Sequence, residues 1–202
     1  MDRKLKAYYQ KRLQEHGATA EGVGWNGAVA QEVRFAQLCR VIQHDSFSVN
    51  DLGCGTGDLA GYLRTRYQQA RYLGLDVMPA MIDAAKTRFN DRQTRFRLIK
   101  AYDALPEADY TLASGIFNLK FDKSTAQWKQ YILRTLQRMN RASQFGFAFN
   151  ALTKYSDKPK MKRELYYADP LWLFDFCKLH FSRNVALLHD YDLFDFTILV
   201  KK

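Results

Sequence analysis

The sequence has few cysteines and no long apolar segments. None of its apolar runs reaches the roughly 18 residues that a membrane-spanning helix needs. The opening segment MDRKLKAYYQKR is charged and lacks the apolar core of a secretory signal peptide. The three cysteines, Cys39, Cys54 and Cys177, have neither metal-ligand nor disulfide-framework spacing. These absences predict a cytoplasmic protein with no membrane segment and no metal site.

Internal repeats, low-complexity segments and dividing linkers are also missing from the sequence. Its 202 residues fit one domain with a single core, and a content of 47% hydrophobic and 26% charged residues is typical of a soluble globular protein. We therefore expect one domain over residues 1–202. It would have an N-terminal helical cap (1–45), an α/β core (46–202) and, within that core, a substrate loop (153–168).

Positive charge is in excess, with a formal net charge of +10. Basic proteins attract nucleic acids and anionic small molecules, although Lys and Arg also simply solvate helix faces. The charges are spread along the chain except in the segment TKYSDKPKMKR. That segment holds Lys154, Lys158, Lys160, Lys162 and Arg163. Both readings of the charge, an anionic partner and a solvated surface, stay open at this point.

After His44 short apolar runs alternate with helical patterns. The strand candidates are residues 47–52, 71–76, 95–101, 109–117, 144–152, 185–191 and 194–201. The helical patterns include MPAMIDAAKTRF, where Pro79 suits a first turn. A very short connection joins the last two strands, so the final strand must run antiparallel to its predecessor. The pattern predicts an α/β fold: a doubly wound, mostly parallel seven-stranded sheet with a C-terminal antiparallel hairpin strand and helices on both faces.

The first predicted strand runs into a glycine-rich turn in VNDLGCGTGDLA. Ligands of such sheets bind at the carboxyl ends of the strands, where this turn lies. An NAD fingerprint needs a third glycine where Asp58 stands, and the Gly-Lys-Ser/Thr of a phosphate-binding loop is absent. Asp51 and Asp58 flank the turn and would repel a pyrophosphate. A ligand with a positive centre and no phosphate, such as S-adenosylmethionine, fits better.

Two further carboxylates lie at comparable places. Asp76 ends the second predicted strand, where it can accept hydrogen bonds from both ribose hydroxyls, and Asp103 follows the third strand within reach of an adenine amino group. Asp103 could instead cap a helical turn. The fourth strand ends in ASGIFN, whose small residues would let a methyl donor and its acceptor come close.

These segments resemble the class I, Rossmann-like, S-adenosylmethionine-dependent methyltransferases. VNDLGCGTGDLA is similar to the first motif of that family, LGLDVMPAMIDAAK to its acidic second motif, and YDALPEADYTLASGIF to its third and fourth motifs. The terminal hairpin is similar to the reversed seventh strand of the family. The resemblance implies S-adenosylmethionine as cofactor, S-adenosylhomocysteine as product, and a cofactor site made of Asp51, Gly53, Cys54, Gly55, Gly57, Asp76, Val77, Asp103, Ala104 and Ser114.

A general base would have to lie at the carboxyl ends of the strands. His189 ends the sixth predicted strand and is the first candidate, with Tyr155 as the second; a structural hydrogen bond is the alternative role for His189. The expected acceptor-binding residues flank the same edge. They are Trp25, Phe117, Asn118, Lys154, Tyr155 and Tyr166, and we expect Tyr9 to belong to the cap above them.

The leading hypothesis is methyl transfer to an oxygen or nitrogen atom of a small, anionic molecule. An RNA or protein acceptor is the runner-up, since the basic surface would attract it. SGIFN lacks the Asn/Asp-Pro-Pro-aromatic signature of enzymes that methylate exocyclic amines or glutamine, and the pyrimidine-type Pro-Cys nucleophile is absent. A nicotinamide-dependent oxidoreductase is disfavoured by Asp58, and a module that binds the cofactor without catalysis is the remaining alternative. The oligomeric state stays open.

Overall fold

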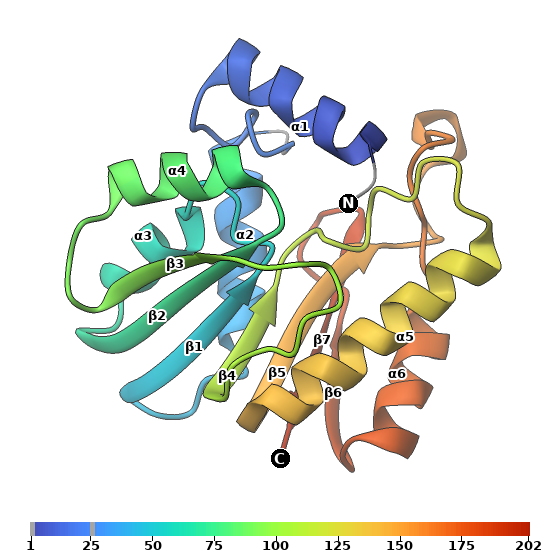
Figure 1. Ribbon diagram of the computed structural model, residues 1–202. Helices are drawn as coiled ribbons and strands as arrows, with labels where there is room; N and C mark the ends of the chain where they lie inside the picture. The colour runs from blue at the N-terminus through green and yellow to red at the C-terminus, as the bar shows by residue number, and fades with distance from the viewer. Residues whose placement is uncertain (1–2, 25–26) are drawn as a thin grey trace.

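A mixed seven-stranded sheet forms the centre of the protein (Figure 1). The computed structural model describes residues 3–24 and 27–202. The strands follow the order β3-β2-β1-β4-β5-β7-β6, and only β7 runs against the others. Their bounds are β1 Ser46–Leu52, β2 Gln69–Asp76, β3 Thr94–Leu98, β4 Ala108–Ala113, β5 Ser143–Leu152, β6 Asn184–Leu188 and β7 Asp195–Lys201. The predicted sheet and its reversed last strand are confirmed.

Helices cover both faces of the sheet. Those of one face are α2 (Ala28–Cys39), α3 (Asp58–Arg64) and α4 (Pro79–Arg88); those of the other are α5 (Thr125–Ala142) and α6 (Pro170–His180). A separate apolar core fills each side, because the central strands are buried on both faces. The remaining elements are α1 (Arg3–His16) and a short 3₁₀ turn, η1 (Lys158–Lys160).

Local sequence signals explain where the helices begin. Ser124 caps α5: its hydroxyl accepts a hydrogen bond from the Gln127 amide, and the Gln127 side chain accepts one from the Ser124 amide. The Asp169 carboxylate caps α6 by accepting a hydrogen bond from the Leu171 amide, and Pro170 opens that helix. Pro79 stands in the first turn of α4, as predicted.

Three strands, β3, β4 and β6, end earlier than the sequence pattern suggests, and β6 ends at Leu188 rather than at Tyr191. β3 ends at Leu98 because the chain turns at once, the Asp103 carboxylate accepting a hydrogen bond from the Lys100 amide at 2.8 Å. β4 ends at Ala113 because Gly115 adopts a positive φ of 75° and donates its amide hydrogen to Asn150 Oδ1 at 2.7 Å. The endings of β3 and β4 bring loops, rather than strand, to the carboxyl edge of the sheet.

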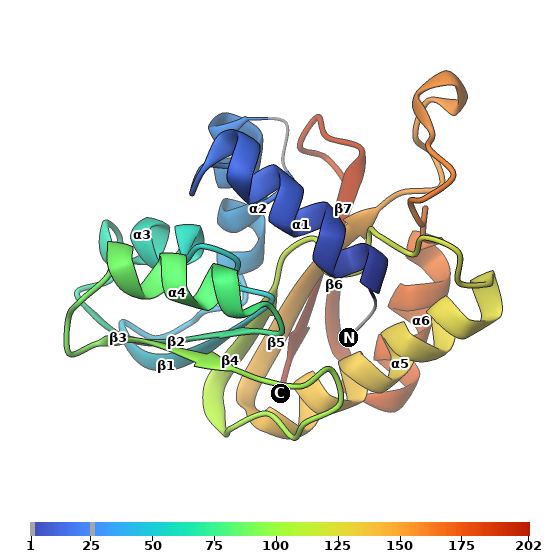
Figure 2. The same ribbon diagram turned by 45° about the horizontal axis from the view of Figure 1, so that its top comes forward.

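That edge is covered by elements from distant parts of the chain. α1 lies across it, above β1 and β4, and the segment after β5, which contains η1, stands away from the body beside it (Figures 1 and 2). α1 and the carboxyl edge enclose the cavity in which a ligand can bind.

Within residues 3–24 and 27–202, no helix combines the length and the apolar character that crossing a bilayer demands.

Candidate active site

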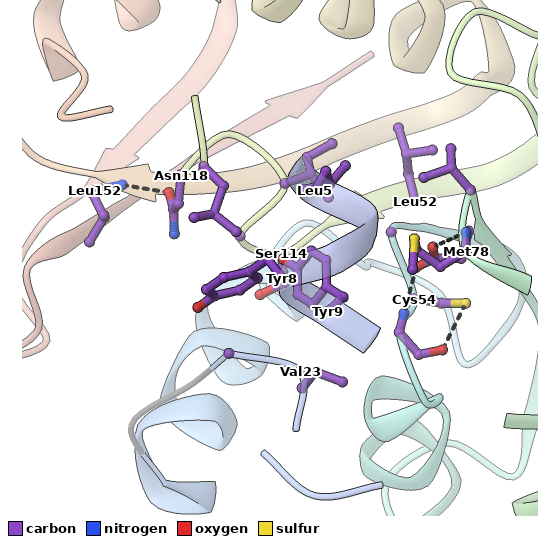
Figure 3. A pocket seen from close by; sticks show the side chains of 18 of the residues that line it. Leu5, Tyr8, Tyr9, Val23, Leu52, Cys54, Met78, Ser114, Asn118 and Leu152 are labelled. Carbon is purple, nitrogen blue, oxygen red and sulfur yellow. Dashed lines mark hydrogen bonds between the residues drawn. The ribbon is translucent and has the colours of Figure 1, made fainter. Parts of the chain in front are cut away.

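A cavity of about 650 Å³ lies between α1 and the carboxyl ends of β1, β2 and β4 (Figure 3). This is the size of a site for a cofactor and a small ligand. One half is made by the strand ends and the glycine turn. The other half is made by the loop between β4 and α5, the loop between β5 and α6, and the residues of α1 and α5 beside them. We call these two parts the cofactor half and the acceptor half.

The glycine turn forms the floor of the cofactor half. Gly53, Gly55 and Gly57 have φ values of 79°, 52° and 85°, a left-handed conformation that favours glycine. A Cβ atom on Gly53 would lie 2.3 Å from Cγ2 of Ile116, which follows β4. The turn can therefore pass close to the end of β4 only because no side chain stands at position 53.

Two buried carboxylates lie beside this turn. Asp76 accepts hydrogen bonds from the amides of Gly55 at 3.0 Å and Met78 at 2.8 Å, and the Tyr72 hydroxyl donates one to Asp51 at 2.6 Å. Burial raises the pKa of Asp51 to about 7, against the effect of Tyr72 and with help from Asp76. Burial also raises the pKa of Asp76. Buried carboxylates this close together favour a ligand that carries positive charge.

Asp58, the third acid of the turn, is already neutralised. Its carboxylate forms an ion pair with Arg88 of α4 at 2.7 Å, and Arg88 also donates to the carbonyl of Thr56. This pair ties the turn and α3 to α4. The negative charge available to a ligand in the cofactor half therefore comes from Asp51 and Asp76.

The acceptor half has apolar and aromatic walls with cations at its mouth. The walls are formed by Leu119, Phe121, Trp128, Tyr131, Leu165 and Tyr167, and the cations are Arg12, Lys123, Lys160 and Lys162. Its two loops are joined: the amides of Lys120 and Phe121 donate to the carbonyl of Glu164, and that of Tyr166 donates to the carbonyl of Asn118. The two loops of the acceptor half thus form one structural unit.

Asn118 is a buried polar residue in the lining of the acceptor half. Its Oδ1 accepts a hydrogen bond from the Leu152 amide at 3.1 Å, which fixes the orientation of the side chain (Figure 3). Its Nδ2 donates to no residue of the described chain, and the side chain lines the cavity. Asn118 therefore offers an oriented N–H donor to a ligand.

Comparisons with known proteins agree with this geometry. Residues 49–143 match the family model of the methyltransferase domain. A Mycobacterium tuberculosis protein named "Putative methyltransferase Rv1506c" is 51% identical over 158 residues, which cover 78% of this chain and 95% of that one. This chain belongs to the class I S-adenosylmethionine-dependent methyltransferases. S-Adenosylmethionine is its cofactor, and the residues around the glycine turn suit that cofactor because they combine close backbone approach with buried negative charge.

More distant proteins are similar to this methyltransferase in part or in fold. The malonyl-[acyl-carrier protein] O-methyltransferase of Laribacter hongkongensis is 35% identical over 98 residues, and the match spans only 33% of that protein. The magnesium protoporphyrin IX methyltransferase of Synechocystis with bound S-adenosylhomocysteine superposes with a TM-score of 0.65 at 12% identity, covering 98% of this chain and 99% of that one. At that identity the second likeness shows the fold alone.

The structure brings most of the predicted cofactor residues of the methyltransferase to the cavity. Those that line it are Asp51, Gly53, Cys54, Gly55, Asp76, Val77 and Ser114, together with Asn118 from the expected acceptor set. Gly57 lies one step away, as the N-cap of α3. These residues come from strand ends and from the turn, which the sequence pattern located well.

Asp103 and Ala104 are exposed and do not line the cavity. The Asp103 side chain closes the turn after β3 instead, and no helix begins there in the described chain, so its alternative role as a helix cap is wrong. Ile99, Ala101 and Tyr102 line this wall in its place. A contact between Asp103 and adenine stays a prediction that this geometry does not support.

Several predicted acceptor-binding residues also lie elsewhere. Phe117 is fully buried beside Phe149, and Tyr166 is buried. Lys154 forms an ion pair with Asp169 at 2.8 Å, and Tyr155 is exposed. None of these four lines the cavity: the Phe117 and Tyr166 side chains belong to the core, Lys154 is held by Asp169, and Tyr155 faces solvent. Trp25 lies outside the described residues.

His189, the predicted general base, is exposed outside the cavity. Its ring centre lies 6.2 Å from that of Tyr155 and 6.1 Å from that of Phe196. The chain leaves β6 at Leu188 on the far side of β7, at the edge of the sheet, which separates His189 from the glycine turn. No histidine of the described chain lines the cavity.

Several helices contribute residues that sequence reasoning missed, among them Gln31, Arg34 and Phe35 of α2. Leu5, Tyr8 and Arg12 of α1 line the cavity beside Tyr9, which was expected in the cap, and Tyr131, Thr135 and Arg138 of α5 line it from the opposite side. The positions on α1 share one helix face, since they recur at intervals of three and four residues. This spacing in the sequence indicates that one face of the otherwise charged helix contacts the rest of the site.

Proposed function

We propose that this methyltransferase methylates a carboxylate oxygen of a small anionic molecule. The mouth of the acceptor half carries Lys160 and Lys162, and Lys162 has no ion pair with any residue in 3–24 or 27–202. Cations in this position favour an anionic acceptor. The Laribacter relative is, by name, an O-methyltransferase. Both points support oxygen as the methylated atom.

The observation that carries the proposal is the shortage of a general base. Asp51, Asp58 and Asp76 are engaged by Tyr72, Arg88 and backbone amides in the cofactor half, and no described histidine reaches the cavity. Glu164, the other carboxylate that lines the cavity, is exposed on the loop after β5. An alcohol or a protonated amine needs a base to become a nucleophile. A carboxylate is ionised at neutral pH and needs none.

The chain then has to position the reactants and exclude water. Asp76 would hold the ribose, and Asp51 the charged methionine part of the cofactor. When bound, the cofactor supplies a methyl carbon activated by its sulfonium. Asn118 Nδ2 would donate to one acceptor oxygen while Lys162 attracts the negative charge, leaving the second oxygen to attack. α1 would close the cavity above both.

The test is label transfer from methyl-labelled S-adenosylmethionine into a cell extract, separated into small-molecule, RNA and protein fractions. We expect label in the small-molecule fraction, and mild alkali should release it as volatile methanol because methyl esters hydrolyse easily. Alkali-stable label in that fraction would contradict the carboxylate and indicate nitrogen or an ether oxygen. Label in RNA or protein would contradict the small acceptor.

One observation keeps a macromolecular acceptor as the second candidate. Arg71 of β2 and Arg95 and Arg97 of β3 are exposed on the same face of the sheet, and none forms an ion pair within the described chain. A row of unpaired guanidinium groups attracts polyanions. If RNA is the acceptor, raising the salt concentration should weaken its binding strongly, and replacing the three arginines should reduce that salt dependence.

A further inference from the structure

α1 has an apolar face but no place in either core. Leu5, Tyr8, Tyr9 and Arg12 form one helix face, and all four line the cavity. No described residue of α1 is fully buried. An amphipathic helix is normally held by burying its apolar face against the protein. In α1 that face borders the ligand cavity, so a ligand would provide part of its contact surface.

The direct attachments of α1 are modest. Lys4 pairs with Asp122, and both side chains are exposed. The Tyr8 ring packs edge-on against Phe121 at 6.1 Å, and the Arg12 guanidinium donates to the carbonyl of Glu21 at 2.7 Å. Exposed ion pairs contribute little to stability. These contacts orient α1 on the protein, but they contribute little free energy to holding it there.

The two adjacent tyrosines of α1 face different halves of the cavity. Tyr8 contacts Phe121, which belongs to the acceptor half. Tyr9 and Asp76 of the cofactor half line the same cavity, and burial first, then the Asp76 carboxylate, raises the pKa of Tyr9. In Figure 3 Tyr9 lies on the side of Tyr8 that is nearer to Cys54 and Met78. The Tyr9 hydroxyl has no hydrogen bond to any described residue, so it is available to a ligand.

We propose that Tyr9 is a positioning residue of the cofactor half, whose ring covers the bound cofactor opposite Asp76 and thereby couples docking of α1 to cofactor binding. The ring would bury apolar cofactor surface that otherwise faces water. This inference rests on the cofactor and not on the identity of the acceptor.

The first experiment measures the affinity for S-adenosylhomocysteine by calorimetry in the wild type, Tyr9→Ala, Tyr9→Phe and Gln10→Ala. Gln10 is the matched control, because it is the next residue on α1 and is exposed. Tyr9→Ala should raise the Kd by about 10-fold or more, since a large ring contact is lost. Tyr9→Phe keeps the ring and should change the Kd only about 2- to 3-fold. Alanine is the best helix former, so α1 itself should persist.

The second experiment measures trypsin cleavage after Lys6, Lys11 and Arg12 with and without S-adenosylhomocysteine. The ligand should slow cleavage in the wild type and in Gln10→Ala but not in Tyr9→Ala. Equal Kd values for all four proteins, or equal protection in Tyr9→Ala and the wild type, would overturn the proposal. Asp76→Ala separates the possible failures: if it weakens binding while Tyr9→Ala does not, the cofactor site stands and the role of Tyr9 is wrong.

Discussion

The cofactor half and the acceptor half of the cavity are built in different ways. The cofactor half consists of strand ends and one tight turn, so that neighbours in sequence, such as Asp51, Gly53 and Gly55, are also neighbours in the site. The acceptor half combines α1, the loop before α5 and the loop after β5, which are far apart in the chain. In this protein the cofactor is therefore bound by the rigid edge of the sheet, whereas the acceptor-binding part is built mainly from loops, which tolerate more sequence change.

The largest expected effect follows from the glycine turn. Gly53→Ala places a Cβ atom 2.3 Å from Ile116 in a left-handed conformation. We expect S-adenosylhomocysteine affinity to fall by about 100-fold, because turn and strand end must separate. Gly61→Ala is the control: position 61 is helical and its nearest contact is an ordinary 3.6 Å to Phe89. The affinities of the two folded variants are measured by calorimetry. Equal affinities would show that the turn can accommodate a Cβ atom at position 53.

The next prediction concerns the charge of Asp51. Its pKa of about 7 means that lowering the pH from 7.5 to 5.5 protonates it. Because a cationic ligand favours the ionised form, the Kd of S-adenosylhomocysteine should rise on the order of 10-fold over this range. Asp51→Asn should bind more weakly at pH 7.5 and should lose this pH dependence. A pH profile that is the same in both proteins would assign the effect to another group.

Asp51 also affects stability, with the opposite sign. A carboxyl group whose pKa is raised by folding binds its proton more tightly when folded, so the stability that it contributes falls as the pH rises from about 4 to about 7. Asp51→Asn should therefore raise the Tm of the ligand-free protein at pH 8, where the wild type buries the full charge, and change it little at pH 4. A lower Tm at pH 8 would mean that the Tyr72 hydrogen bond outweighs the cost of burial.

A smaller effect is expected in the acceptor half. Lys162→Ala should raise the KM for the acceptor about 5- to 10-fold and leave S-adenosylhomocysteine affinity unchanged, since Lys162 lines the mouth. Lys158→Ala is the matched control, because Lys158 belongs to the same basic segment but does not line the cavity. If both variants raise the KM equally, the basic segment acts only through its long-range charge; if neither does, its lysines only interact with solvent.

The smallest effect should come from His189→Ala. His189 is exposed and separated from the cavity, so turnover should stay within about 2-fold of the wild type at every pH from 6 to 9. A drop of about 100-fold, with loss of one limb of the pH profile, would restore His189 as the base and contradict a base-free carboxylate acceptor.

The sequence predicted the cofactor half far better than the acceptor half. Strand periodicity located the ends of β1 and β2, whereas β4 ends four residues before its predicted end; the sheet then brings Asp51, Asp76 and Ser114 to one edge. Periodicity says nothing about the direction of a loop. Asp103 uses its side chain to close the turn after β3, so that side chain does not reach the cavity. The first residues after β5, Lys154 and Tyr155, also point away from the cavity.

The joined loops of the acceptor half have a consequence for changing acceptor specificity. Leu119 and Leu165 form a β-bridge, and the carbonyls of Asn118 and Glu164 accept amide hydrogens from the opposite loop. If one segment is replaced by that of a relative with a different backbone path, the amides and carbonyls of the other segment lose their hydrogen-bond partners. A chimera that exchanges residues 115–123 and 156–167 together should fold and take on the donor's acceptor, whereas exchange of either segment alone should yield a protein that binds its cofactor and methylates neither acceptor.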